Sequence, residues 1–320
     1  MVQCNGKKES DSLAELKEQY NMAYEDTAQV TKIVISDKSP ARVELTRVQG
    51  GWVVGPQKHP VRKDAIQDLL HTIGSIKMRS FVQEKAIPAV LQRMDTYGKW
   101  VEVYAGEALV ANYIVGTETP DMLGTYYKKV DSELPFAMHI QGFNGYTTTR
   151  FITEETLWYD RTVFGLTEAE IASVELFNPM RYSEGWKIQR AGGENASWEM
   201  IGGEMEPLEV SDPLNVHRAV ASLKTLKYEG VIIPSDNIWS AKDSIFNATP
   251  AFEMTVVTTA GTQHKVQAFY KKPEGAITHR GDGTPYDFDP DRFYAKLDDG
   301  RMVLIQRYAW SHVLRTRFEF

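Results

Sequence analysis

The sequence contains a single cysteine, Cys4, in 320 residues. One thiol cannot form an internal disulfide, so a disulfide-stapled scaffold is excluded. No apolar run approaches the roughly 20 residues that a membrane-spanning helix requires, and we expect no such helix. Lys and Arg are not gathered into a basic stripe, and the formal net charge is -7. Because phosphate neutralisation needs clustered cations, these features argue against a nucleic-acid partner.

The rest of the composition is typical of a folded globular protein. Hydrophobic residues make up 42% of the chain and charged residues 25%, values that indicate neither disorder nor a membrane-embedded bundle. Single hydrophobic cores tend to stop growing near this chain length, so we expect two domains. The sequence lacks a G-x-S-x-G elbow, a P-loop, a G-x-G-x-x-G fingerprint and an H-E-x-x-H pair. We therefore expect a protein that is not an enzyme and uses no cofactor.

Cys4 has three candidate roles. A reactive thiol needs a nearby base or a helix N-terminus, and the polar run Asn5–Ser12 offers neither. A lipid-modified cysteine would instead be the first residue of a mature bacterial lipoprotein. Met1–Gln3 is too short for a signal peptide, so this prediction expects an apolar segment upstream. The third alternative is an incidental cysteine in a cytosolic protein. We predict lipidation of Cys4, with residues 1–28 as the anchor and a polar tether.

The pattern over residues 29–165 predicts a first unit that mixes strands and helices. Apolar residues recur at helical spacing over residues 61–77 and again over 86–97, where Pro88 falls in the first turn. Short runs with alternating apolar residues, separated by Gly and Pro, predict strands around these helices. The predicted strands cover residues 31–36, 41–48, 50–55, 78–82, 99–106, 108–116, 124–130 and 135–142.

The same order of events recurs over residues 166–320, which predicts a second unit of the same kind. Trp198 stands where Trp52 stands in the first half, a match that favours a shared packing role. Matches this dense indicate internal repetition, so each half should bury its own core, with a boundary near Gly165. On the first repeated helix, Ile66, Leu70, Ile73, Ile76 and Lys77 match Val216, Val220, Leu223, Leu226 and Lys227.

The turns between the strands are short. Runs such as AGEA, TAGT and DDGR favour antiparallel hairpins, whereas a parallel sheet would need a helix between most strands. The predicted fold class is therefore α+β, with two tandem repeated units. Each unit should be a mainly antiparallel sheet with two helices packed on one face.

Several motifs resemble the bacterial family called domain of unknown function 4340. The resemblance is strong from Glu25 to Phe164 and looser in the second half. It implies a secreted or lipid-anchored cell-envelope protein, in some cases encoded beside transport-system components, with no established reaction. It supplies no catalytic residues. The motifs that carry it are EDTAQVTKIVISD at residues 25–37, GGWVV at 50–54, GTYYKK at 124–129, PFAMHIQGFNGYTTTRF at 135–151 and WYDRTVF at 158–164.

An acidic stretch near the C-terminal end offers a candidate calcium loop. Asp287, Asp289 and Asp291 alternate as the first three ligands of such a loop would, and Asp298 stands where the closing acid belongs. Arg292 occupies the position that calcium loops give to glycine. The alternative is a solvated acidic insertion in a hairpin. A calcium-dependent adhesive module built on this loop remains one functional alternative.

A second alternative is a hydrolase whose acids and histidines assemble only in three dimensions, with His264 and the acidic loop as its candidates. We favour a binding or assembly module instead. The segment between the two units carries aromatic side chains among glycines and threonines, and a groove between domains is a usual place for a partner site. The predicted partner-binding residues are Phe143, Tyr146, Phe151 and Trp158. The expected partner is another envelope protein, with transport-system components as candidates, and the expected location is the cell envelope.

Overall fold

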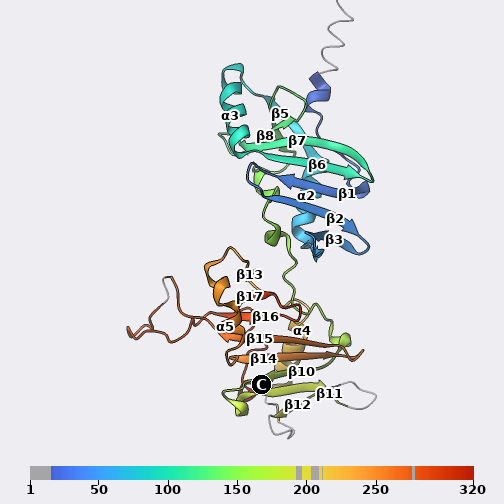
Figure 1. The fold of residues 1–320 in the computed structure, drawn as a ribbon. Coiled ribbons are helices and arrows are strands. Elements are labelled where there is room, and N and C mark those ends of the chain that lie inside the picture. The colour runs from blue at the N-terminus through green and yellow to red at the C-terminus, as the bar shows by residue number, and fades with distance from the viewer. Residues whose placement is uncertain (1–15, 192–196, 203–208, 211, 276–277) are drawn as a thin grey trace, which may run out of the picture. The chain divides into compact units, whose positions relative to one another are not determined.

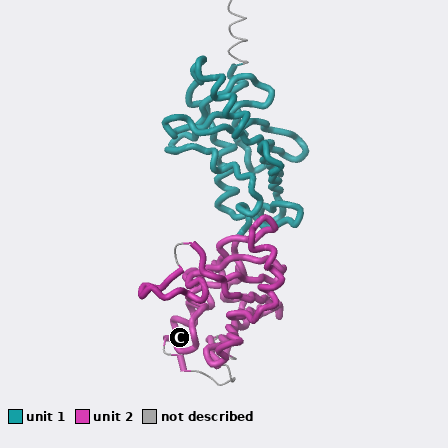
Figure 2. The backbone as a smooth tube through the Cα atoms, turned by 60° about the vertical axis from the view of Figure 1, so that its left-hand side comes forward, with its two compact units in different colours: residues 1–160 teal, residues 161–320 magenta. Residues whose placement is uncertain are grey.

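The computed structural model describes residues 16–191, 197–202, 209–210, 212–275 and 278–320. The chain divides into two compact units, residues 1–160 and 161–320 (Figure 2). Each unit is built on one antiparallel sheet, with nine strands in the first and eight in the second. Both units also contain helices, so the chain has a mixed α and β fold. Among the described residues, no helix combines the length and the apolar character needed to cross a membrane.

In the first unit, the strands lie in the order β4-β3-β2-β1-β6-β7-β8-β9-β5 (Figure 1). Two helices, α2 (Lys63–Ser75) and α3 (Ile87–Tyr97), lie on either side of β5 in the chain. The strands are β1 (Val30–Ser36), β2 (Arg42–Val48), β3 (Gly51–Val54), β4 (His59–Pro60), β5 (Ile76–Phe81), β6 (Lys99–Ala105), β7 (Ala108–Glu118), β8 (Thr125–Lys129) and β9 (Phe136–Ile140).

In the second unit, the strands lie in the order β12-β11-β10-β14-β15-β16-β17-β13. Its helices are α4 (Pro213–Ser222) and the short α5 (Lys242–Phe246). The strands are β10 (Ile171–Phe177), β11 (Trp186–Arg190), β12 (Trp198–Gly202), β13 (Gly230–Val231), β14 (Phe252–Thr258), β15 (Gln263–Tyr270), β16 (Arg292–Lys296) and β17 (Met302–Gln306).

The two sheets have the same order of strands when each is numbered along its own part of the chain, apart from the additional β4 at one edge of the first. Both also have an irregularity at the same place. The pairing of β1 with β6 shifts register after Val30, and that of β10 with β14 shifts after Ile171. A bulge of this kind interrupts the ladder and leaves backbone groups that need other partners.

An arginine supplies those partners in both units. Arg47 donates from Nε to the carbonyl oxygen of Val30 at 2.6 Å, and its guanidinium lies 4.9 Å from the ring centre of Trp52. Arg190 donates from Nε to the carbonyl oxygen of Ile171 at 2.8 Å and lies 4.7 Å from the Trp198 ring. Each arginine reaches a second carbonyl in the turn just before the strand. We call each set an arginine clamp.

The main core of the first unit lies on one face of its sheet. Tyr113 and Phe151 are buried there, with ring centres 6.4 Å apart. Leu69 of α2 is fully buried, and Arg150 donates to the Thr72 hydroxyl of α2 at 2.9 Å. This bond ties α2 to the segment that carries Phe151, so α2 covers the same face of the sheet.

Helix α3 lies on the opposite face of that sheet. A Cβ built on Gly116 of β7 would come within 2.7 Å of Met94 in α3. Gly116 and Tyr113 point to opposite faces, because side chains alternate along a strand. The prediction of two helices on one face is therefore wrong for this unit.

The second unit also has a helix on each face. Val220 of α4 belongs to a large core with Phe293 and Val303. Phe246 of α5 packs instead in a separate cluster with Tyr294 and Met302. Neighbouring residues of a strand point to opposite faces, so α4 and α5 cover different faces of the sheet. The hydrophobic period identified helices but carried no information about the face that each one covers.

Two boundaries differ from the predicted ones. The units meet at residues 160 and 161 rather than near Gly165, because Val163 and Gly165 already donate to the carbonyls of Leu226 and Leu223 in the second unit. The later part of the predicted tether, which spans residues 1–28, is attached to the first unit. Tyr24 donates to the carbonyl of Ile73 at 3.0 Å, and Met22 is buried.

The arginine clamps give a stability prediction. Replacing Arg190 with methionine removes two hydrogen bonds from a charged donor, so Arg190→Met should lower the free energy of unfolding of the second unit by about 2 kcal/mol. Arg47→Met should do the same in the first unit. Denaturant unfolding of the full chain measures both, with the exposed Arg218→Met as the control. A change below about 0.5 kcal/mol, the usual effect of a surface substitution, would show that the clamp is not structural.

Candidate functional site

The second unit contains a cavity of about 390 Å³ at one end of its sheet. Residues near the ends of β10 and β15 and at the starts of β14 and β16 line it, and these ends meet at one edge because the strands are antiparallel. Segments that follow β10 and β17 complete the wall. The cavity therefore collects residues that are far apart in the sequence, and we call it the arginine cavity after its most prominent polar groups.

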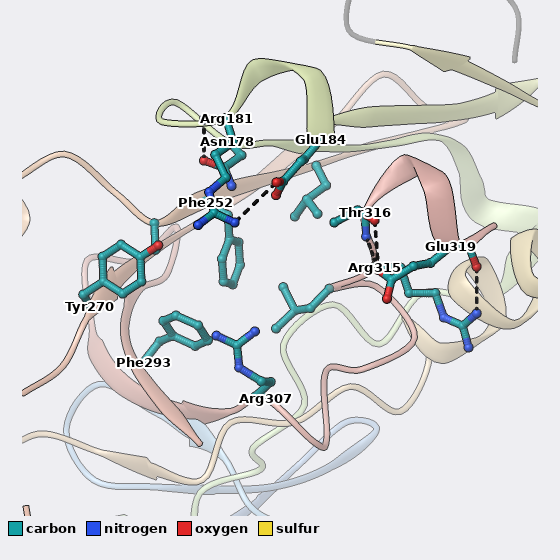
Figure 3. Close-up of a pocket in the computed structure, with 13 residues that line it drawn as sticks. Asn178, Arg181, Glu184, Phe252, Tyr270, Phe293, Arg307, Arg315, Thr316 and Glu319 are labelled. Atoms are coloured by element: carbon teal, nitrogen blue, oxygen red, sulfur yellow. Dashed lines mark hydrogen bonds and ion pairs between the residues drawn. The ribbon is translucent and has the colours of Figure 1, made fainter. Parts of the chain in front are cut away.

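Aromatic rings form one side of the arginine cavity. Phe252 and Phe293 meet edge to face, with ring centres 5.4 Å apart, and both are almost fully buried. Tyr270 lies beside them and stacks on Phe288 at 4.1 Å. In Figure 3 the Phe252 ring lies between Arg181 and Arg307, and the Phe293 ring lies beside Arg307. This wall is apolar and rigid, as favoured in sites that bury a ligand's apolar part.

Arg181 approaches from one side (Figure 3). Its loop is held by Asn178, whose side-chain oxygen accepts hydrogen bonds from the backbone N–H groups of Met180 and Arg181, each at 3.1 Å. The Arg181 guanidinium lies 3.3 Å from a carboxylate oxygen of Glu184. This single contact leaves most of the guanidinium donors available.

Arg307 approaches from the other side (Figure 3). Its Nε donates to the carbonyl oxygen of Pro290 at 3.0 Å, and its guanidinium lies 4.9 Å from the centre of the Phe293 ring. Within the part of the chain that the structure describes, no carboxylate forms an ion pair with Arg307. Its guanidinium therefore brings to the cavity a positive charge that no carboxylate of the described residues pairs with.

The third wall is fixed by a capping box. The Glu319 carboxylate accepts from the backbone N–H of Thr316 at 2.6 Å and from its hydroxyl at 3.1 Å. Arg315 donates to the carbonyl oxygen of Glu319 at 3.1 Å, and in Figure 3 its guanidinium points away from the cavity centre. Both acids that line the cavity, Glu184 and Glu319, are thus already engaged by groups of their own segments.

The surface beside the cavity is apolar and exposed. Met180 and Tyr182 are 65% and 66% exposed, and Tyr182 contacts the partly exposed Phe177 ring at 5.4 Å. Arg and aromatic residues are enriched at protein interfaces. An arginine side chain stays protonated throughout the physiological range, so it binds anions and does not transfer protons. The arrangement suits recognition of an anionic group attached to an apolar one.

The predicted partner residues lie elsewhere. Phe151 and Trp158 are fully buried in the first unit, and the Trp158 indole donates to the carbonyl of Ile152 at 3.0 Å. These two are core residues, so their prediction as a partner surface is corrected. Phe143 is partly exposed beneath the Arg150 guanidinium, and Tyr146 is half-buried. Cys4 lies outside the described residues.

The acidic stretch does not fold as a calcium loop. Within the described residues, no three His, Cys, Asp or Glu side chains come together as a metal site. Asp289 faces the buried Lys271 ammonium at 3.4 Å, and its other oxygen accepts from the backbone N–H groups of Asp291 and Arg292. A lysine and a turn therefore occupy the oxygens that calcium would need. Asp287 lies 3.9 Å from Arg280 and Asp298 accepts from the backbone of Lys265.

His264 and Asp298 do come together, as one element of the hydrolase alternative requires. Nδ1 of His264 lies 3.1 Å from Asp298 at a partly exposed position. A catalytic triad also needs a hydroxyl or thiol bonded to the other ring nitrogen. None of the hydroxyl groups in the described ranges makes that hydrogen bond to His264, whose side chain bonds Asp298.

The protein consists of two units that combine helices and strands, and each unit is built on one antiparallel sheet. The chain matches the family model described as domain of unknown function (DUF4340) over residues 52–244, and it belongs to that family. The matched segment begins in β3 and ends in α5, so it spans both units and includes Arg181 but not Arg307. A search of curated proteins and a search of solved structures each gave no match.

The residues of the arginine cavity were missed by sequence reasoning. Arg181, Phe252, Phe293 and Arg307 belong to four different segments, and no local spacing links them. The correspondence of Phe252 and Phe293 with polar positions of the first unit appears only in the strand registers.

A pair of ionic side chains beside the acidic stretch gives a pH prediction. Arg292 donates to both carboxylate oxygens of Glu229, from Nε at 2.7 Å and from Nη2 at 3.1 Å, and this bond holds the pKa of Glu229 below its ordinary value of 4.5. A carboxyl whose pKa is lower in the folded state than in the unfolded state stabilises the fold at pH values above its ordinary pKa. This stabilisation is lost as the pH falls through the pKa of the folded state. Glu229→Gln should therefore lower the melting temperature at neutral pH.

The difference between Glu229→Gln and the wild type should shrink as the pH falls below 4.5, because the wild-type carboxyl is then protonated as well. Melting curves across this range test the expectation. Glu175→Gln, at an exposed position of β10, is the control and should show no such convergence. A constant difference down to strongly acidic pH would contradict the assigned ion pair.

Proposed function

We propose that this protein is a lipid-anchored binding module of the cell envelope, and that its second unit carries the surface that binds a partner protein. The observation that carries the proposal is the arginine cavity together with the exposed apolar loop beside it. Arg307 has no carboxylate partner among the described residues, and Met180 and Tyr182 present apolar surface beside the cavity. Surfaces with this composition bind proteins more often than the average surface does.

The proposal assigns binding rather than catalysis to this site. The two guanidinium groups do not exchange protons in the physiological range. The carboxylates of Glu184 and Glu319 are held by Arg181 and Thr316, respectively. These are the features of a preorganised recognition site, in which side chains are fixed before the ligand arrives and less ordering entropy is lost on binding.

The duplication of one ancestral unit is a second part of the proposal. The shared strand order, the shared bulge and the two arginine clamps support it. The clamps are the most specific of these, because each combines an arginine, a tryptophan and the same backbone carbonyl in the first central strand.

Attachment to the membrane would come from Cys4. The support is the polar, charge-rich segment over residues 5–15, which separates Cys4 from the first described residue, and the resemblance to a family of envelope proteins. The expected partner is another envelope protein, with components of a transport system as the candidates. No calcium or other cofactor is part of this proposal.

Lipidation is tested on Cys4. When the gene is expressed in its native cell with its full upstream coding region, the protein should incorporate a labelled fatty acid and fractionate with membranes. Cys4→Ser should lose the label and leave the membrane fraction, because the acylated sulfur is the attachment point. A Ser10→Cys, Cys4→Ser double variant is the control for the position of the thiol. Equal membrane attachment of wild type and Cys4→Ser would contradict the anchor.

Partner binding is tested at Tyr182. A photoreactive amino acid in place of Tyr182 should give a discrete crosslinked product in intact cells, and mass spectrometry should identify an envelope protein in it. The same amino acid at the exposed Tyr97 of the first unit is the matched control and should give no such product. Products of equal yield at both positions, or none at Tyr182, would contradict a binding surface on the second unit.

A further inference from the structure

The registers of the two sheets identify equivalent positions. Counted from the bulge, Asp37 after β1 corresponds to Asn178 after β10, because each follows the last paired residue of its strand. On the neighbouring strands, Lys99 corresponds to Phe252. Pairing across the next two strands then relates Thr125 to Phe293. The residues named second line the arginine cavity, and the residues named first mark the same place in the first unit.

In the first unit, this place is occupied by a segment of the chain itself. Thr125 accepts a hydrogen bond from the backbone N–H of Thr147 at 2.8 Å. Lys99 donates to the carbonyl oxygen of Thr148 at 3.2 Å, and Asp37 accepts from the hydroxyl of Thr153 at 2.8 Å. Burial lowers the pKa of Lys99. The three equivalent residues thus hold the segment Thr147–Thr153 against the end of the sheet.

In the second unit, the residues at these three positions make no such bonds to a returning segment in the part of the chain that the structure describes. Phe252 and Phe293 replace the lysine and the threonine, and Asn178 accepts from its own loop. The place is left as a cavity of about 390 Å³. The first unit therefore displays how a strip of polypeptide fits this end of the sheet, while the second unit offers the same place with an apolar floor.

The charges around the cavity set the chemistry of an incoming segment. Arg307 has no carboxylate partner in the described part of the chain, and Arg181 has one contact at 3.3 Å. A carboxylate can bind a guanidinium through two parallel hydrogen bonds, and this fork geometry is specific to planar anions. In Figure 3 the Phe252 ring lies between the two arginines and the Phe293 ring lies beside Arg307, at a suitable position for an apolar side chain next to the acid.

We propose that the arginine cavity binds an extended segment of the partner protein that carries an acidic residue next to an aromatic or aliphatic one. The acid pairs with Arg307, the apolar side chain rests on Phe252 and Phe293, and the flanking residues cover Met180 and Tyr182. This inference rests on the proposed function and names the chemistry of the partner at that site. The exposed apolar loop extends the contact beyond what a small anion would cover.

A displayed library of random peptides, selected on the full chain, tests the inference. Enriched peptides should share an acidic residue adjacent to an apolar one. A synthetic copy of an enriched peptide, followed by fluorescence anisotropy, should bind about ten- to a hundredfold more weakly to Arg307→Gln, the range for loss of a hydrogen-bonded charge pair. The twin peptide with glutamine or asparagine in place of the acid should lose a similar factor. Affinity should also fall as salt is added.

Two variants serve as controls. Arg218→Gln removes the same charge from the exposed face of α4, outside the cavity, and should bind the peptide as the wild type does. Arg181→Gln changes a guanidinium whose side chain is 68% exposed, so it should fold normally and still weaken binding. It therefore keeps the test valid if the melting temperature shows that Arg307→Gln is unstable.

Three results would overturn the inference. One is enrichment of no peptides, or of peptides without an acidic residue. Another is equal binding to wild type, Arg307→Gln and Arg181→Gln. The third is binding of a small aromatic carboxylate, such as phenylacetate, as tightly as the best peptide, which would make the cavity a small-molecule site. A crosslinked partner at Tyr182 together with any of these results would leave the proposed function standing and reject only the acidic segment.

Discussion

The hydrogen bond from an arginine to the carbonyl at the bulge of the first central strand is the interaction on which each unit depends. Arg47 makes it to Val30 and Arg190 makes it to Ile171. A shift of one residue in a strand moves every side chain to the other face of the sheet. The clamp ties the first strand to its hairpin and to the preceding turn, and the register of that strand sets which side chains enter the core and which reach the sheet end.

The position of the arginine cavity follows from that register. Three equivalent residues at the end of each sheet face the same place, and the two units differ in what occupies it. The first unit uses Lys99, Thr125 and Asp37 to hold its own chain. In the second unit Phe252 and Phe293 stand in place of the lysine and the threonine, Asn178 binds its own loop, and the place is a cavity of about 390 Å³. The strand order is the same around both places, while the side chains at these three positions differ.

The sequence predicted the elements well where the hydrophobic period was strong. The helix expected over residues 61–77 is α2, but it ends at Ser75 because Ile76 is buried and pairs with Ile140 in the sheet. Tertiary pairing overrode the helical spacing at that end. The Trp52 and Trp198 match also found a shared packing position, since both rings lie against a clamp arginine.

What could not be predicted depends on contacts between distant residues. Phe151 and Trp158 lie in a segment rich in glycine and threonine that resembles an exposed connection, yet both are buried because the segment folds back onto the first sheet. Asp289 has the spacing of a calcium ligand, but Lys271 supplies the cation. The arginine cavity is assembled from strand ends and loops, and its charge balance is visible only when Arg307 and Glu184 are placed in space.

Hydrogen exchange measured on the full chain, with and without a bound partner segment, tests the central claim most directly. The account predicts that binding protects the backbone amides of residues 178–184 and 314–319 in the second unit and leaves residues 147–153 unchanged, since the first unit already fills the equivalent place. Protection confined to the first unit, or an exchange pattern that does not change around the arginine cavity, would contradict it.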